Sequence, residues 1–131
     1  MPWIQNVSFD GIQKGHHFDP GVNSLLIQIV DPDMDFPKPA FPFKVVHQFK
    51  FLDIEEEHEQ AITEEQAMEI ARILLDALDN RMNVTVHCVA GVCRSGAVTE
   101  VGTMIGFTDT ETFRIPNLMV KRKLINELSK G

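Results

Sequence analysis

Cysteine is scarce in this sequence, with two residues in a chain of 131. Two cysteines do not make the disulfide framework of a small secreted domain, so they indicate chemistry or simple packing. No apolar run approaches the roughly 18–20 residues that span a bilayer. The N-terminus has neither a basic region nor a long apolar segment, so we expect no signal peptide, no membrane partner and a cytoplasmic location.

Basic residues are also few, because 12 Lys and Arg stand against 19 Asp and Glu, for a net charge of −7. Duplex binding rests on neutralising phosphates with Lys and Arg, so we expect no nucleic-acid partner. A small phosphorylated ligand is still compatible with this charge, since one local cation can dominate a site. The sequence has no internal repeat, low-complexity tract or linker. We therefore expect one domain over residues 1–131, a size sufficient for a hydrophobic core.

Strand and helix signals alternate along the first two thirds of the chain. Residues 1–23 are rich in Gly, His, Asp and Pro and are expected to form loops with one short strand. A β-rich apolar run at 24–30 ends in an Asp-Pro-Asp turn, and residues 44–52 alternate as a second strand. Thr63 and Gln66 then form a capping box, which predicts a helix with one apolar face.

The last third of the chain continues this alternation. A short β-branched strand at 83–87 leads into residues 88–95, which combine small, apolar and reactive side chains. Residues 96–105 are small and apolar, as in a helix packed tightly under a sheet. Pro116 precedes a last amphipathic helix at 117–129. This order predicts an α/β domain with helices covering a central sheet.

The segment between Cys88 and Arg94 has the features of an anion-binding loop. Its backbone N–H groups can turn inward to form a nest, and the helix that follows adds its positive dipole end. Gly91 lets the backbone curl, because it adopts angles that a β-carbon would forbid. Such a cradle fits a phosphate dianion. The expected phosphate-binding residues are Val89, Ala90, Gly91, Val92, Cys93 and Arg94.

The residues around this loop have the chemistry of a nucleophilic site. The cradle favours the thiolate form of Cys88, which is the nucleophilic form. Arg94 supplies a planar fork that can bind two phosphoryl oxygens at once. Ser95 can donate a hydrogen bond to the sulfur, which helps it to leave a phosphocysteine intermediate. We therefore expect these three residues to be catalytic.

The string from His87 to Ser95, HCVAGVCRS, resembles the signature of the protein tyrosine and dual-specificity phosphatase superfamily. The chain is most similar to the compact dual-specificity-type phosphatases of bacteria and their phages. Residues 49–56 resemble their acid-loop segment, and residues 116–119 resemble a stretch after the signature helix. The resemblance implies a mixed central sheet flanked by helices, no metal or other cofactor, and a two-step mechanism through phosphocysteine. It also implies that His87 supports the loop and transfers no proton.

Cleavage of a phosphate monoester also needs a general acid, a role typically worth about 10²–10⁴-fold in rate. Asp53 is the best candidate, because it ends the second strand and precedes Cys88 by a distance similar to that in the family. The glutamates that follow Asp53 favour its protonated form by repulsion, or they compete for its role. The carboxylates that remain as alternatives are Glu55, Glu56, Glu57, Glu59, Asp31, Asp33 and Asp35.

Cys93 departs from the dual-specificity pattern, in which Ser or Thr usually precedes the arginine. Low-molecular-weight tyrosine phosphatases carry a second cysteine at that place, where it can form a protective disulfide with the nucleophile. We hypothesise the same exchange between Cys88 and Cys93. The alternative is a small buried residue in place of serine. The other histidines share no ligand spacing with cysteines or carboxylates, so we expect no metal site.

Three functions compete for this sequence. The first is a phosphatase that hydrolyses phosphotyrosine, and phosphoserine or phosphothreonine, on proteins or small phosphoesters. The second is a catalytically weak phosphate-binding module that recognises phosphorylated partners. The third is another cysteine-based anion loop, such as a sulfurtransferase or arsenate reductase, but Arg94 followed by Ser95 fits phosphoryl transfer better. The apolar side chains of Val89, Ala90 and Val92 argue against inositol polyphosphates as substrates.

Overall fold

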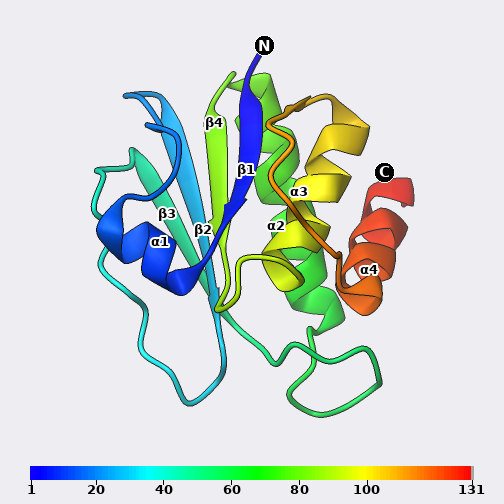
Figure 1. The fold of residues 1–131 in the computed structure, drawn as a ribbon. Helices are drawn as coiled ribbons and strands as arrows, with labels where there is room; N and C mark the ends of the chain where they lie inside the picture. Colours follow the sequence, from blue (N-terminus) through cyan, green and yellow to red (C-terminus); the bar gives the residue numbers. More distant parts are fainter. Residues whose placement is uncertain (131) are drawn as a thin grey trace.

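The computed structural model describes residues 1–130, which form five strands and four helices. Their bounds are β1 (Trp3–Val7), α1 (Phe9–Lys14), β2 (Ser24–Val30), β3 (Val45–Lys50), α2 (Glu64–Asp79), β4 (Asn83–His87), α3 (Arg94–Ile105), β5 (Thr108–Asp109) and α4 (Leu118–Ser129). The strands form one sheet in the order β3-β2-β4-β1-β5. The predicted α/β class, with a central sheet and flanking helices, is confirmed (Figure 1).

The sheet differs in one respect from the mixed sheet that the resemblance implied. Each pair of neighbouring strands that the structure describes is parallel. A parallel pair needs a crossover connection from the end of one strand back to the start of its partner. Here α1, the loop at 31–44, α2 and α3 supply those crossovers, so the strands all end at the same edge of the sheet (Figure 1).

The two faces of the sheet are covered differently. Helices α2, α3 and α4 pack over one face and enclose the main hydrophobic core, while α1 lies against the other face (Figure 1). A smaller cluster of Val7, Ile12 and Leu26 fills the space under α1. Strand β2 is buried along its whole length because both of its faces are covered, as its continuous apolar pattern predicts.

The helix starts agree with the signals in the sequence. The Thr63 side chain accepts a hydrogen bond from the Gln66 amide N–H at 3.0 Å, and the Gln66 side chain accepts from the Thr63 N–H at 2.9 Å, so the capping box is confirmed. Helix α4 is capped by Asn117, whose side chain accepts from the Val120 N–H. Helix α3 begins at Arg94, which was predicted to lie at the start of a helix.

The first 23 residues are more regular than expected. They contain β1, which lies between β4 and β5, and the short helix α1. The polar residues Gln5 and Asn6 hide the strand pattern, yet both are buried. Among residues 1–130, no helix is long and apolar enough to cross a bilayer.

Candidate active site

The loop at 88–93 lies at the edge of the sheet where the parallel strands end. Cys88 directly follows the last residue of β4, and Arg94 is the first residue of α3. In open α/β sheets, ligands bind at the carboxyl ends of the strands. The strand–loop–helix arrangement predicted around the signature is therefore present, with the start of α3 directed at the loop.

The sulfur of Cys88 has two hydrogen-bond partners. Its Sγ lies 3.1 Å from the Ser95 Oγ and accepts a hydrogen bond from the Gly91 N–H at 3.3 Å. The residue is only 2% exposed, but it lines a cavity of about 350 Å³. Both contacts hold the sulfur in place at this cavity.

Gly91 sits where the loop approaches the end of β1. Its φ is +77°, and a β-carbon there would lie 2.4 Å from the Ser8 backbone nitrogen. The buried Asn6 donates from its side-chain amide to the Gly91 carbonyl at 2.7 Å and to the Phe113 carbonyl at 2.9 Å. Asn6 was not predicted as a site residue. Its only sequence signal is an amide beside Gln5 in the otherwise apolar run from Trp3 to Val7.

Arg94 is almost fully buried, with 4% of its surface exposed. Its Nη1 donates to the Asp31 Oδ1 and to the Phe51 carbonyl, each at 2.7 Å. Its Nε is buried without a hydrogen-bond partner among the residues that the structure describes. Asp31, predicted only as a remote candidate for the acid, thus contacts the arginine of the signature.

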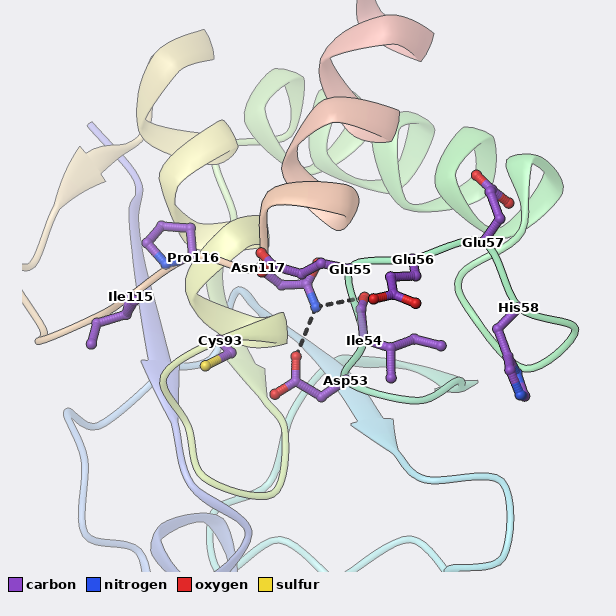
Figure 2. A pocket seen from close by; sticks show the side chains of 10 residues that line it. All are labelled: Asp53, Ile54, Glu55, Glu56, Glu57, His58, Cys93, Ile115, Pro116 and Asn117. Atoms are coloured by element: carbon purple, nitrogen blue, oxygen red, sulfur yellow. Dashed lines mark hydrogen bonds between the residues drawn. The ribbon is translucent and has the colours of Figure 1, made fainter.

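Asp53 is the residue predicted to act as the general acid. It follows β3 and lines the same cavity as Cys88 and Arg94. Its Oδ1 accepts a hydrogen bond of 2.8 Å from the Asn117 side-chain amide, which also donates to the Ile54 carbonyl at 3.0 Å (Figure 2).

The other carboxylates are placed elsewhere. Glu55, Glu56 and Glu57 line a neighbouring pocket of about 580 Å³ and do not line the cavity that reaches Cys88 (Figure 2). The Glu55 carboxylate accepts from the backbone N–H of α4's first residue, and Glu57 forms an ion pair with Lys123. The alternative acids Asp33, Asp35 and Glu59 are exposed and line neither pocket.

Cys93 occupies the last loop position before α3 and lies beside Asp53 in the neighbouring pocket (Figure 2). Partial burial and the negative charges of Asp53 and Cys88 raise the pKa of its thiol. Its carbonyl accepts from the N–H groups of Ala97 and Asn117, each at 2.9 Å. Through these contacts the loop is bound both to α3 and to the start of α4.

His87 is completely buried at the end of β4. Burial lowers the pKa of its side chain to about 4, so the ring is neutral near neutral pH. Its Nδ1 lies 3.3 Å from the Cys88 carbonyl, and the Phe9 ring packs edge-on against it. These contacts fit the supporting role expected for it. Within residues 1–130, no group of three potential metal ligands is found.

Comparison with known proteins identifies the fold. No protein-family model and no curated protein match the sequence. In structure the chain is similar to the human tyrosine phosphatase-like serine/threonine/tyrosine-interacting protein, with a TM-score of 0.65 and 16% identity over 99% of this chain and 93% of that one. For human DUSP28 the TM-score is 0.64 at 14% identity, over 99% of this chain and 94% of that one.

A viral protein is similar as well. The chain is similar to OH1 from the Orf virus, a tyrosine phosphatase, with a TM-score of 0.54 and 16% identity over 96% of this chain and 82% of that one. These three similarities extend over nearly the whole chain. The protein therefore has the fold of the dual-specificity and tyrosine phosphatases, as the HCVAGVCRS signature predicts.

Proposed function

We propose that the protein is a cysteine-dependent phosphatase that hydrolyses phosphate monoesters through a phosphocysteine intermediate. The observation that carries this proposal is one cavity lined by Cys88, Arg94 and Asp53, with Ser95 hydrogen-bonded to the sulfur. Together these residues provide a nucleophile, a cation for the phosphoryl oxygens, an acid and a group that assists the departing thiolate.

In the first step the Cys88 thiolate attacks phosphorus, and the bond between phosphorus and the ester oxygen breaks. Asp53 gives a proton to the leaving oxygen, which would otherwise depart as an unstable anion. The N–H groups of the loop and the Arg94 guanidinium stabilise the charge that develops on the three phosphoryl oxygens. The products of this step are an alcohol or phenol and phosphocysteine.

In the second step water attacks the phosphorus of phosphocysteine, and the Asp53 carboxylate takes a proton from that water. The bond between phosphorus and sulfur breaks, and inorganic phosphate leaves. Ser95 lies 3.1 Å from the sulfur, so its hydroxyl can donate to the thiolate as the bond opens. This hydrogen bond therefore stabilises the Cys88 sulfur both when it attacks phosphorus and when it leaves phosphocysteine.

The substrate class follows from the charges around the cavity. Among the described residues that line it, Arg94 is the only cationic side chain, and two aspartates lie nearby. Such a site suits a single phosphate group better than an inositol polyphosphate. We therefore propose phosphotyrosine on proteins as a substrate, with phosphoserine, phosphothreonine or small phosphoesters as further ones. The similar OH1 is described as a tyrosine phosphatase with triple substrate specificity, which supports this range.

The second candidate is a phosphate-binding module without turnover. It is favoured by the similarity to a human protein that is named tyrosine phosphatase-like and interacting. Such a module would use the loop and Arg94 to hold a phosphorylated partner, and it would not need the acid.

Hydrolysis of p-nitrophenyl phosphate in the presence of EDTA separates the two candidates. We expect metal-free turnover by the wild type, none by Cys88→Ser, and a large loss in Arg94→Lys, which keeps the charge but loses the fork. Asp53→Asn should lose about 10²–10⁴-fold with poor leaving groups and much less with good ones. If the wild type is inactive under reducing conditions but binds phosphopeptides, the binding module is the correct function.

A further inference from the structure

We propose that Asp31 is a positioning residue that fixes the orientation of the Arg94 guanidinium for phosphoryl binding. The proposal rests on the phosphatase function proposed above and adds a residue to its machinery. Asp31 lines the cavity with Cys88 and Arg94, and its side chain is 35% exposed. It is the one carboxylate among the described residues that contacts this arginine.

The five N–H groups of Arg94 fall into two sets, those that donate to other residues and those that do not. Nη1 carries two hydrogens, and both are used, one by the Asp31 Oδ1 and one by the Phe51 carbonyl, each at 2.7 Å. Nε and Nη2 make no hydrogen bond to residues 1–130. These two atoms form one edge of the planar guanidinium, which is the edge that can bind two phosphoryl oxygens side by side.

The fold places both acceptors where they can hold Nη1. Asp31 follows the last residue of β2 and Phe51 follows the last residue of β3, and these two strands end in register at Val30 and Lys50. Strand β4, which precedes Cys88, is the other neighbour of β2. The two acceptors and the nucleophile therefore come from the ends of three adjacent parallel strands.

The backbone of Asp31 is restrained by its neighbours in the chain. A residue before proline is limited to extended backbone angles, and Pro32 imposes this limit on Asp31. The Asp31 carbonyl also accepts from the Met34 N–H at 3.0 Å, which closes a turn. Asp31 is thus held at the cavity by local chain geometry, so its carboxylate can act as a fixed anchor.

The buried position of Arg94 explains why an anchor is needed. A charged side chain that is 96% removed from solvent is costly to bury unless it is paired and hydrogen-bonded. Without Asp31 the guanidinium would keep only the Phe51 carbonyl as an acceptor, and it could rotate around that single contact. We therefore assign Asp31 to the arginine and Asp53 to the leaving group.

Two neutral variants isolate this role, because Asp31→Asn keeps an acceptor oxygen while Asp31→Ala removes it. Both variants remove the same negative charge, so the difference between them reports on the acceptor alone. We expect kcat/KM for p-nitrophenyl phosphate to fall about 10–100-fold in Asp31→Ala, as for the loss of a hydrogen bond to a charged group. Asp31→Asn should recover most of that loss, within about 5-fold of the wild type.

Asp33→Ala is the matched control, because Asp33 lies in the same segment, is exposed and makes no side-chain hydrogen bond or ion pair to residues 1–130. It should retain wild-type kinetics. Thermal melting of each variant shows whether a loss of activity reflects unfolding. A second readout is the affinity for inorganic phosphate by calorimetry, which should be weaker in Asp31→Ala than in Asp31→Asn.

The outcomes are distinct. The proposal is overturned if Asp31→Ala has wild-type kcat/KM, or if the alanine and asparagine variants are equally impaired. If both variants lose the same activity, and only on substrates with poor leaving groups, Asp31 is instead the general acid. If the wild type hydrolyses no phosphate ester, the proposed phosphatase function is wrong. The affinities of Asp31→Ala and Asp31→Asn for inorganic phosphate then still test whether Asp31 positions Arg94. Equal affinities in the two variants would then refute the positioning role.

Discussion

Asp53 and Asn117, 64 residues apart, are joined by a hydrogen bond of 2.8 Å from the side-chain amide to the carboxylate. Asn117 is buried, donates to the Ile54 carbonyl as well, and accepts from the Val120 N–H at the start of α4. One side chain thus fixes the segment that carries the proposed acid and also caps a helix. The position of Asp53 depends on the packing of α4 against the loop.

Asn117→Ser tests this coupling, because serine can cap α4 but is too short to hold Asp53. We expect Asn117→Ser to keep most of the stability and to lose activity mainly with poor leaving groups. Asn117→Ala should also lose about 1–2 kcal/mol of unfolding free energy through the missing cap. Denaturant unfolding and kinetics on aryl phosphates of graded leaving-group ability measure both effects. Wild-type activity in Asn117→Ser would show that Asp53 does not depend on this contact.

Gly91→Ala should lower stability and activity more than the positive φ of residue 91 alone would explain. Gly21 has nearly the same φ, +78°, but a β-carbon there would meet nothing within 4 Å, whereas one at Gly91 would overlap Ser8. We expect Gly21→Ala to cost about 1–2 kcal/mol with normal activity. Gly91→Ala should cost more, and it should lower kcat/KM by about 10²-fold through displacement of the loop.

Thermal melting and steady-state kinetics on both glycine variants provide the comparison. Equal melting temperatures and equal activities in Gly91→Ala and Gly21→Ala would mean that the loop does not need to approach β1.

His87 should make the protein less stable in mild acid. Its pKa is about 4 in the folded protein, below the value of about 6.5 of an exposed histidine. Below pH 6.5 the unfolded chain therefore takes up the proton first, and stability falls as the pH approaches 4. Relative to His87→Gln, the wild type should lose roughly 3 kcal/mol of unfolding free energy between pH 7 and pH 4.

Urea unfolding across this pH range measures the difference. The matched control is His16→Gln, because His16 is exposed. A wild-type curve parallel to that of His87→Gln would show that folding does not lower the pKa of His87.

Cys93 gives a prediction on oxidation. We expect hydrogen peroxide to convert the Cys88 thiolate to a sulfenic acid while the peroxide is reduced to water. The Cys93 thiolate then attacks that sulfur and displaces hydroxide, which takes up a proton to become water, and a disulfide forms. Because the pKa of Cys93 is raised, its thiolate is scarce at neutral pH, and disulfide formation should accelerate as the pH rises from 7 to 9.

Peptide mass spectrometry after peroxide treatment should find a Cys88–Cys93 linkage, and activity should return on reduction. Cys93→Ser should instead accumulate sulfinic or sulfonic Cys88 and stay inactive. If the wild type contains only over-oxidised Cys88, Cys93 is simply a small residue in place of serine.

Local signals were sufficient for much of the fold and for the loop between Cys88 and Arg94. Residues 24–30 and 83–87 are strands with the predicted bounds, and the capping box at Thr63 starts α2. The strand before Cys88 and the helix after it are set by short-range patterns, so the sequence was enough to place Cys88 beside Arg94. These features depend on residues close together in the chain.

The residues that the sequence did not reveal act through long-range contacts. Asn6 bonds to the Gly91 carbonyl 85 residues away, and Asp31 bonds to Arg94 63 residues away. No periodic pattern marks such partners, because they meet only when the sheet has formed. One short strand was expected in residues 1–23, but its position was not predicted for the same reason, since Gln5 of β1 is buried with a hydrogen bond to Thr85 and not by apolar character. The all-parallel sheet also depends on crossovers that local patterns do not specify.

The central claim is that Cys88 carries the phosphoryl group during turnover. Ser95→Ala keeps the nucleophile but removes the hydroxyl 3.1 Å from its sulfur, so the second step should slow and the intermediate should accumulate. We would mix this variant with p-nitrophenyl phosphate, quench with acid within the first turnover and map the peptides by mass spectrometry. The account predicts one added phosphoryl group on the peptide with Cys88, a burst of nitrophenol, and neither in Cys88→Ser. Turnover that persists in Cys88→Ser, with no phosphoryl group on Cys88 in Ser95→Ala, would contradict it.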